Sequence, residues 1–190
     1  GLNVLPPGVE RHVVNGGGLT GLQIFPDDEI EIINDEGNQI CEIICFNKDG
    51  KSELGILNLK ESNKFNFIKE ILNSKDESSL ATNYQLRKRN LDIKLSKSAI
   101  VFDIDTPSGE RIKLKSKDKS YVIFAAPQNN MLISEQNPSS DLTIFIKRSK
   151  IKNDKELAVI PDPVYEPSYE KNIDRQTSIS YQVKEGDYIQ

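Results

Sequence analysis

The chain has 190 residues, a length that suits one ordinary domain or one domain with part of another. Its 25 basic and 29 acidic residues give a net charge of −4, and this balance argues against nucleic acid as the main partner. No apolar run approaches the ~20 residues of a membrane-spanning helix, so we also expect no membrane partner.

Alternating hydrophobicity in the first fifty residues predicts four strands, over residues 9–14, 19–25, 29–33 and 38–46. Turn-forming residues separate them, beginning with the glycine run at 16–18. Residues 34–37, Asn-Asp-Glu-Gly, predict a hairpin that joins the third strand to the fourth. The fourth strand is apolar on both faces, which indicates that both of its sides are covered.

The middle of the chain changes to helical spacing before strands resume. Helices are predicted over residues 64–72 and 79–89, and the basic run Arg-Lys-Arg at 87–89 is interpreted as a solvated helix face. Further strands are predicted over 99–105, 111–115, 121–125 and 142–147, with a hairpin turn at 106–109. We therefore expect a mainly β fold, a sandwich or closed barrel of about eight to ten strands with one or two inserted helices.

The composition shifts after residue 158, where three prolines fall within residues 161–167. This predicts a β domain over 1–158 and an extended connector over 159–175. Residues 182–190 resemble residues 23–31, so 176–190 is interpreted as the start of a second, truncated repeat. On this reading the chain is an amino-terminal piece of a longer protein.

Two cysteines, Cys41 and Cys45, would lie on one face of a strand about 13 Å apart, too far for a disulfide with each other. We expect both to be buried thiols, and with one histidine in the chain, His12, we expect no metal site. Reduced cysteines and the lack of an export signal at the start of the sequence predict a cytoplasmic protein.

The candidate ligand-binding residues are Asn38, Gln39 and Glu42. Glu42 shares an otherwise apolar strand face with Ile40 and Ile44, so it is either paired, at an edge, or directed at a ligand. The amides of Asn38 and Gln39 could bind a small polar ligand or could satisfy backbone groups in the turn. No catalytic residue is predicted, because no nucleophile motif accompanies His12 and the glycine run lacks the phosphate-loop pattern.

The stretch from 30 to 49, with Glu-Gly-Asn-Gln at 36–39 and Phe-Asn at 46–47, resembles the urea-carboxylase-associated domain family. The resemblance covers about residues 9–130 and implies a β-rich fold. In some members it also implies a metal site and a role beside urea or guanidine breakdown. Where those members carry a His-Asp pair and clustered cysteines, this sequence has Ala-Ala-Pro-Gln-Asn-Asn-Met at 125–131, and Glu42 stands where the family usually has aspartate.

The same resemblance extends to longer proteins that end in a folate-dependent aminomethyltransferase module, similar to the glycine-cleavage T-protein. It implies that this chain is a non-catalytic, accessory amino-terminal domain, with downstream domains as partners and folate bound in a downstream module. Two alternatives stay open. One is a small-molecule enzyme acting on urea- or guanidine-type compounds, with its pocket around Asn38, Gln39 and Glu42. The other is a ligand-sensing or homo-oligomerising module.

Overall fold

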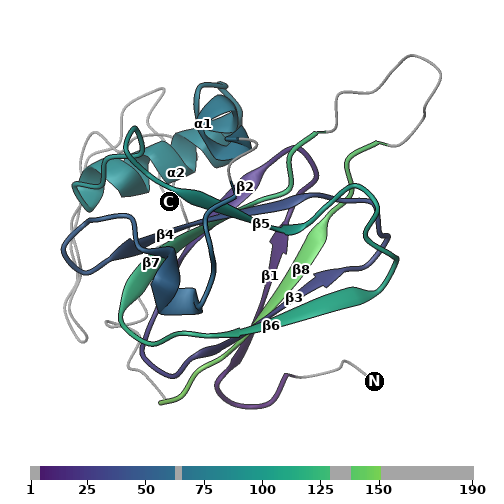
Figure 1. Cartoon of the computed structure of the whole chain (residues 1–190), viewed down its shortest axis with the longest axis horizontal. Helices are drawn as coiled ribbons and strands as arrows, with labels where there is room; N and C mark the ends of the chain where they lie inside the picture. Colours follow the sequence, from purple (N-terminus) through teal and green to yellow (C-terminus); the bar gives the residue numbers. More distant parts are fainter. Residues whose placement is uncertain (1–4, 63–65, 129–137, 151–190) are drawn as a thin grey trace, which may run out of the picture.

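Two four-stranded antiparallel sheets face each other in the computed structural model, which describes residues 5–62, 66–128 and 138–150 (Figure 1). Within these residues the chain forms eight strands, two α-helices and one 3-10 helix. The expectation of a mainly β fold is confirmed, and the arrangement is a sandwich, not a closed barrel. The predicted connector at 159–175 and repeat at 176–190 lie outside the described residues.

The first sheet has the strand order β1 (Val9–Val14), β8 (Leu142–Lys147), β3 (Glu29–Asn34), β6 (Glu110–Lys115). The second has the order β2 (Leu19–Ile24), β7 (Ser120–Ala125), β4 (Cys41–Asn47), β5 (Ser98–Phe102). Between β4 and β5 the chain forms η1 (Leu54–Leu57), α1 (Phe67–Leu72) and α2 (Glu77–Lys88).

Successive strands alternate between the two sheets, with β4 and β5 as the exception. The hairpin predicted at 34–37 is therefore wrong, because β3 pairs with β6 and β8 whereas β4 pairs with β5 and β7. The hairpin predicted at 106–109 is wrong for the same reason. Each turn does reverse the chain, but it carries the chain across the sandwich, where the apolar faces of both strands meet.

Contact between these two turns explains the glycine at position 37. Gly37 has a φ of +79°, and a Cβ there would lie 2.5 Å from the backbone nitrogen of Ser108. A side chain is excluded by the approach of the second turn as well as by the backbone conformation. The turn continues through Gln39, so β4 begins at Cys41, later than the sequence predicted.

Strand β4 is buried on both faces, as its sequence predicted. Ile43 and Cys45 belong to the core between the sheets, whereas Ile44 and Phe46 pack in a second cluster beneath the helices. Both cysteines are buried and free, which confirms that they act as apolar side chains.

The two helices lie over the outer face of the second sheet (Figure 1). Ile68 of α1 and Leu86 of α2 reach the cluster beneath them. The carboxylate of Asp76 caps α2 by accepting a 2.9 Å hydrogen bond from the backbone N–H of Ser79. None of the helices in the described part of the chain is both long enough and apolar enough to cross a membrane.

Candidate functional site

The structure directs the three predicted ligand residues to three different neighbours. Asn38 is exposed in the turn before β4, with a φ of +56° and its backbone N–H donating to the carbonyl of Thr106 at 2.7 Å. Asparagine tolerates this left-handed conformation better than most residues. Asn38 therefore has a clear role in shaping the turn, and its binding of a ligand stays a prediction.

Gln39 is 1% exposed, and the structure uses both ends of its amide. Its Nε2 donates to the carbonyls of Ile40 and Pro127, each at 2.9 Å. Its Oε1 accepts from the backbone N–H of Ser140 at 2.8 Å. The side chain thus ties the turn before β4 to the segments that follow β7 and precede β8.

Glu42 is fully buried beneath α1. Its Oε2 accepts a 2.7 Å hydrogen bond from the backbone N–H of Ile68 in the first turn of the helix. Burial raises the pKa of Glu42 above 4.5, although hydrogen bonds from the Ser98 side chain and from the backbone of Ile68 and Phe67 act in the opposite direction. The geometry is that of a paired carboxylate that holds the helix on the sheet.

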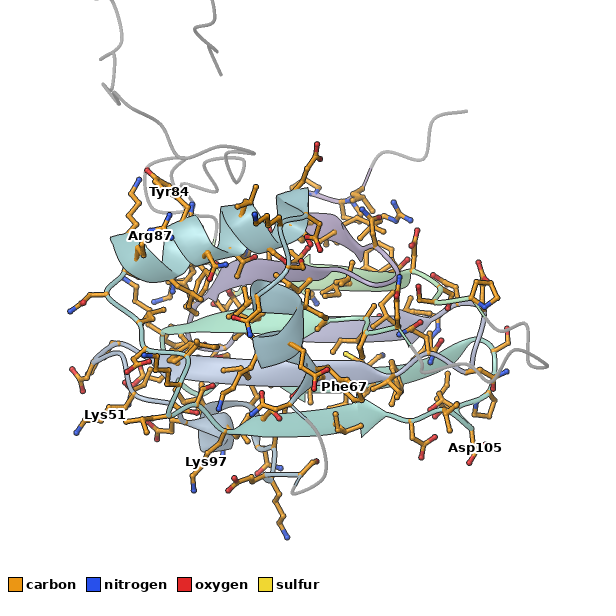
Figure 2. All side chains as sticks on the ribbon, turned by 90° about the horizontal axis from the view of Figure 1, so that it is seen from above. Lys51, Phe67, Tyr84, Arg87, Lys97 and Asp105 are labelled. Carbon is orange, nitrogen blue, oxygen red and sulfur yellow. The ribbon has the colours of Figure 1, made fainter. Side chains whose placement is uncertain are left out.

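A polar cleft of about 330 Å³ opens at one end of the second sheet. Its walls are the turn after β4 (residues 47–50), the segment after α2 (89–91), the residues at the start of β7 (119–121), and Gln23. Figure 2 shows Lys51, next to this turn, and Asp105, next to the Asn38 turn, at opposite ends of the sheets. The cleft and Asn38 therefore lie at opposite ends of the sandwich.

The side chain of Asn47 fixes the first wall of the cleft. Its Oδ1 accepts from the backbone N–H groups of Asp49 and Lys51, both at 3.0 Å, and its Nδ2 donates to Glu53 at 2.7 Å. Gly50 closes the turn with a φ of +78° and donates its N–H to the Asn47 carbonyl at 3.0 Å. These hydrogen bonds fix the conformation of the turn.

Arg89 forms the second wall. Its guanidinium lies over the ring of Tyr121, 4.5 Å from the centroid, and its Nη1 donates to Oε1 of Gln85. The basic run at 87–89 thus divides: Arg87 and Lys88 are exposed as predicted, whereas Arg89 is half-buried and turned to the sheet. Figure 2 shows Arg87 and Tyr84 on the outward side of α2.

A second cleft, of about 460 Å³, lies between the glycine run at 16–18 and the start of α2. Two carboxylates line it, Asp76 and Glu77, and Asp76 already accepts hydrogen bonds from Ser74, Ser78 and the backbone of Ser79. Asp76 is therefore engaged in the fold at the start of α2.

A buried ion cluster lies near the end of β8. Arg148 donates twice to Glu10, at 2.8 and 3.0 Å, and once to Asp28 at 2.7 Å. His12, on the edge strand β1, lies 2.9 Å from the Glu10 carboxylate. Every charge here has a partner, which gives the cluster a structural role.

No three His, Cys, Asp or Glu side chains come together to hold a metal ion within residues 5–62, 66–128 and 138–150. The thiols are also poor nucleophiles, because burial raises the pKa of Cys41 well above its usual range and that of Cys45 to about 12.

The cleft could not be predicted from the sequence, because its residues come from three connecting segments and from Gln23 of β2, which are distant along the chain. The available signals were the basic run at 87–89 and the Asn-Lys-Asp-Gly turn at 47–50. Nothing in either stretch indicates that the basic run and the turn lie side by side in the fold.

Comparison with curated proteins finds a sequence relative along almost the whole chain. No protein-family model matches the chain. The chain is 33% identical over 186 residues to the trimethylamine-oxide aldolase of Ruegeria pomeroyi, an alignment that covers 98% of this chain and 23% of that protein. The chain therefore spans less than a quarter of the relative's length.

Among solved structures, the chain is similar to a crystal structure of a DUF1989 family protein from Silicibacter pomeroyi. The TM-score is 0.42, the sequence identity is 10%, and 85% of each chain is covered. Similarity at this level supports no inference about function.

Proposed function

We propose that this chain is a domain of an enzyme that breaks down a small methylated nitrogen compound of the trimethylamine-oxide type. The observation that carries the proposal is the 33% identity to a trimethylamine-oxide aldolase along 98% of the chain. For the complete protein, it favours an enzyme that acts on a small nitrogen compound over an aminomethyltransferase. It also moves the substrate class from urea and guanidine compounds to amine oxides.

The proposed reaction is balanced without an added oxidant. An aldolase acting on trimethylamine oxide would break one C–N bond, one C–H bond of that methyl group and the N–O bond. It would form the C=O bond of formaldehyde and the N–H bond of dimethylamine, and these two products together contain all the atoms of the substrate. The methyl carbon is oxidised to the aldehyde as the nitrogen is reduced from the amine oxide to the amine. The proton lost from carbon is balanced by the one gained at nitrogen.

Within such an enzyme, we assign this domain a supporting role. The two buried polar residues of the predicted site are committed to the fold, Gln39 through three backbone hydrogen bonds and Glu42 through the start of α1. The reacting groups would then lie in other parts of the polypeptide. We also propose that the domain associates with itself. Light scattering tests this by measuring its molar mass in solution.

The test is a product assay on the complete polypeptide encoded by the gene, with trimethylamine oxide as substrate. We expect dimethylamine and formaldehyde in equal amounts, and no ammonia from urea or guanidine. The 190-residue chain by itself should give neither product. If the complete polypeptide releases ammonia from urea and leaves trimethylamine oxide intact, the proposal is wrong and the urea-type alternative stands.

The folate module also remains a proposal. Formaldehyde is a one-carbon unit of the kind that tetrahydrofolate accepts, so an aminomethyltransferase-like module elsewhere in the polypeptide would consume the product of the proposed reaction. Binding of tetrahydrofolate to the complete polypeptide, and not to the 190-residue chain, is the expected result. Equal binding to both would place the folate site in this domain.

A further inference from the structure

We propose that the cleft beside Arg89 binds a small dianion, either a phosphate monoester or a dicarboxylate. This inference does not rest on the proposed function, because it concerns a site at the far end of the sandwich from the predicted ligand residues. Three observations support the proposal: the excess positive charge of the cleft, the fixed position of the Arg89 guanidinium, and the volume of the cleft.

Three cations line the cleft, Lys48, Arg89 and Lys119, against one carboxylate, Asp49. Two positive charges are therefore left over, in a chain whose net charge is −4. No carboxylate in the described part of the chain forms an ion pair with any of the three cations. A ligand with two negative charges would balance this excess.

The Arg89 guanidinium is held in place before a ligand binds. Tyr121 supports one face of it and Gln85 accepts from Nη1. Among the described residues no further hydrogen bond from the Arg89 guanidinium is seen, so its other N–H groups can form the paired contacts that carboxylate and phosphate oxygens favour. Holding the cation beforehand reduces the conformational entropy lost on binding.

Asn90 adds a neutral donor next to this arginine. Its backbone has a φ of +55°, and its N–H donates to the carbonyl of Arg87 at 3.0 Å, so the tight turn after α2 is fixed. Its side chain is exposed on the cleft wall and has no hydrogen-bond partner among the described residues. The volume of about 330 Å³ suits a small metabolite.

The experiment is a titration of the 190-residue chain, followed by backbone amide NMR at constant ionic strength, with glycerol 3-phosphate and with succinate as separate probes. We expect saturable shifts at the amides of Gly50, Asn90 and Lys119 with at least one probe. Tighter binding of glycerol 3-phosphate identifies a phosphate site, and tighter binding of succinate identifies a dicarboxylate site. Sulfate should bind more weakly than the better probe.

Matched variants separate a built site from general charge attraction. The double variant Lys48→Gln with Lys119→Gln removes two cleft charges, and Lys75→Gln with Lys113→Gln removes two exposed charges elsewhere. The cleft pair should raise the Kd about tenfold and the control pair less than about twofold. Arg89→Lys keeps the charge but loses the planar fork, and should also weaken binding.

Three outcomes would overturn the proposal. The first is the absence of saturation by either probe up to about 20 mM, which is weaker than most specific sites. The second is an equal loss of affinity in the control pair. The third is binding of sulfate as tight as that of both probes, which would indicate simple ion attraction. All four lysines are exposed, so we expect the variants to fold, and thermal unfolding checks this.

Discussion

Burial of the Glu42 carboxylate costs free energy, and its hydrogen bond to the start of a short helix offsets part of that cost. Helix α1 has six residues, too few to be stable without packing. The Glu42 side chain supplies an acceptor for the Ile68 N–H, which the helix itself cannot satisfy in its first turn. The residue is thus one of the contacts that fix α1 on the second sheet.

Replacing Glu42 should separate hydrogen bonding from charge. Glu42→Ala leaves buried donors without an acceptor and should cost about 2–4 kcal/mol of unfolding free energy. Glu42→Gln keeps an acceptor oxygen and should cost clearly less. Urea unfolding measures both, with the exposed Glu36→Gln as the control. Equal losses in the Ala and Gln variants would mean that the carboxylate charge, not the acceptor, matters.

The raised pKa of Glu42 also makes the stability of the wild type depend on pH. Because the native state holds this proton more tightly than the unfolded chain, the stabilisation is complete below about 4.5 and is lost as the pH rises through the native pKa. Glu42→Gln lacks this dependence. The stability of the wild type relative to the Gln variant should therefore fall as the pH rises from 4.5, and a constant difference would contradict the burial argument.

At the scale of elements, strands β2 and β7 fit closely where Gly21 of β2 meets the ring of Tyr121 of β7. Tyr121 on β7 lies across Gly21, where a Cβ would be 1.9 Å from the tyrosine Oη and 2.5 Å from Cζ. A glycine within a strand often marks such a close approach. The ring that fits here is the same ring on which Arg89 stacks, so the element that shapes the sheet also positions the cation.

Gly21→Ala should therefore destabilise the protein by about 1–3 kcal/mol, the usual effect of overpacking. Gly55→Ala is the matched control, because a Cβ at Gly55 meets nothing within 4 Å. Adding Tyr121→Leu to Gly21→Ala should recover part of the loss. A double-mutant cycle by chemical unfolding measures the coupling. Additive effects would show that the two side chains do not compete for the same space.

At the scale of the whole molecule, the Arg148 cluster joins the two sheets at one end of the sandwich. Arg148 follows β8 and pairs with Glu10 on β1, both in the first sheet. It also donates to the carbonyl of Gln23 on β2 in the second sheet, at 2.8 Å, and to Asp28 in the turn between β2 and β3. The guanidinium is nearly fully buried. Removing one of its acidic partners would leave a buried charge without compensation and would destabilise the protein.

The cluster predicts how stability depends on acid. Burial alone would raise the pKa of Glu10, but hydrogen bonds from His12 and Arg148 and the charge of Arg148 together lower it from 4.5 to about 2. The native state therefore releases this proton more readily than the unfolded chain. The resulting stabilisation is present above 4.5 and is lost as the pH falls towards 2.

Glu10→Gln tests this dependence. The advantage of the wild type over the variant should be of the order of 2 kcal/mol at pH 6, after a discount for the part of the side chain that solvent reaches, and should shrink between pH 4.5 and 2. Denaturant unfolding of both proteins across this range provides the measurement. Glu36→Gln serves again as the exposed control. A difference that grows in acid would refute the assignment.

Much of the fold follows from local pattern in the sequence. The predicted strands at 9–14 and 142–147 have the same bounds as β1 and β8. Both helices overlap the ranges predicted for them, 64–72 and 79–89, although α2 begins two residues earlier than predicted. The orientation of Glu42, with Ile44 and Phe46 towards one cluster, also follows from alternation along the strand. What could not be predicted was its partner, because Ile68 is 26 residues away in sequence.

The sequence alone determined that the protein is built from strands, which of their faces are apolar, and that β4 is covered on both sides. These properties depend on the two-residue repeat of an extended backbone, which each segment carries within itself. Only the tertiary structure decided which sheet each strand joins, that Glu42 holds a helix, and that Arg89 meets Lys48 and Lys119 in one cleft. Those contacts depend on how distant segments compete to bury their apolar faces together, and no single segment contains that information.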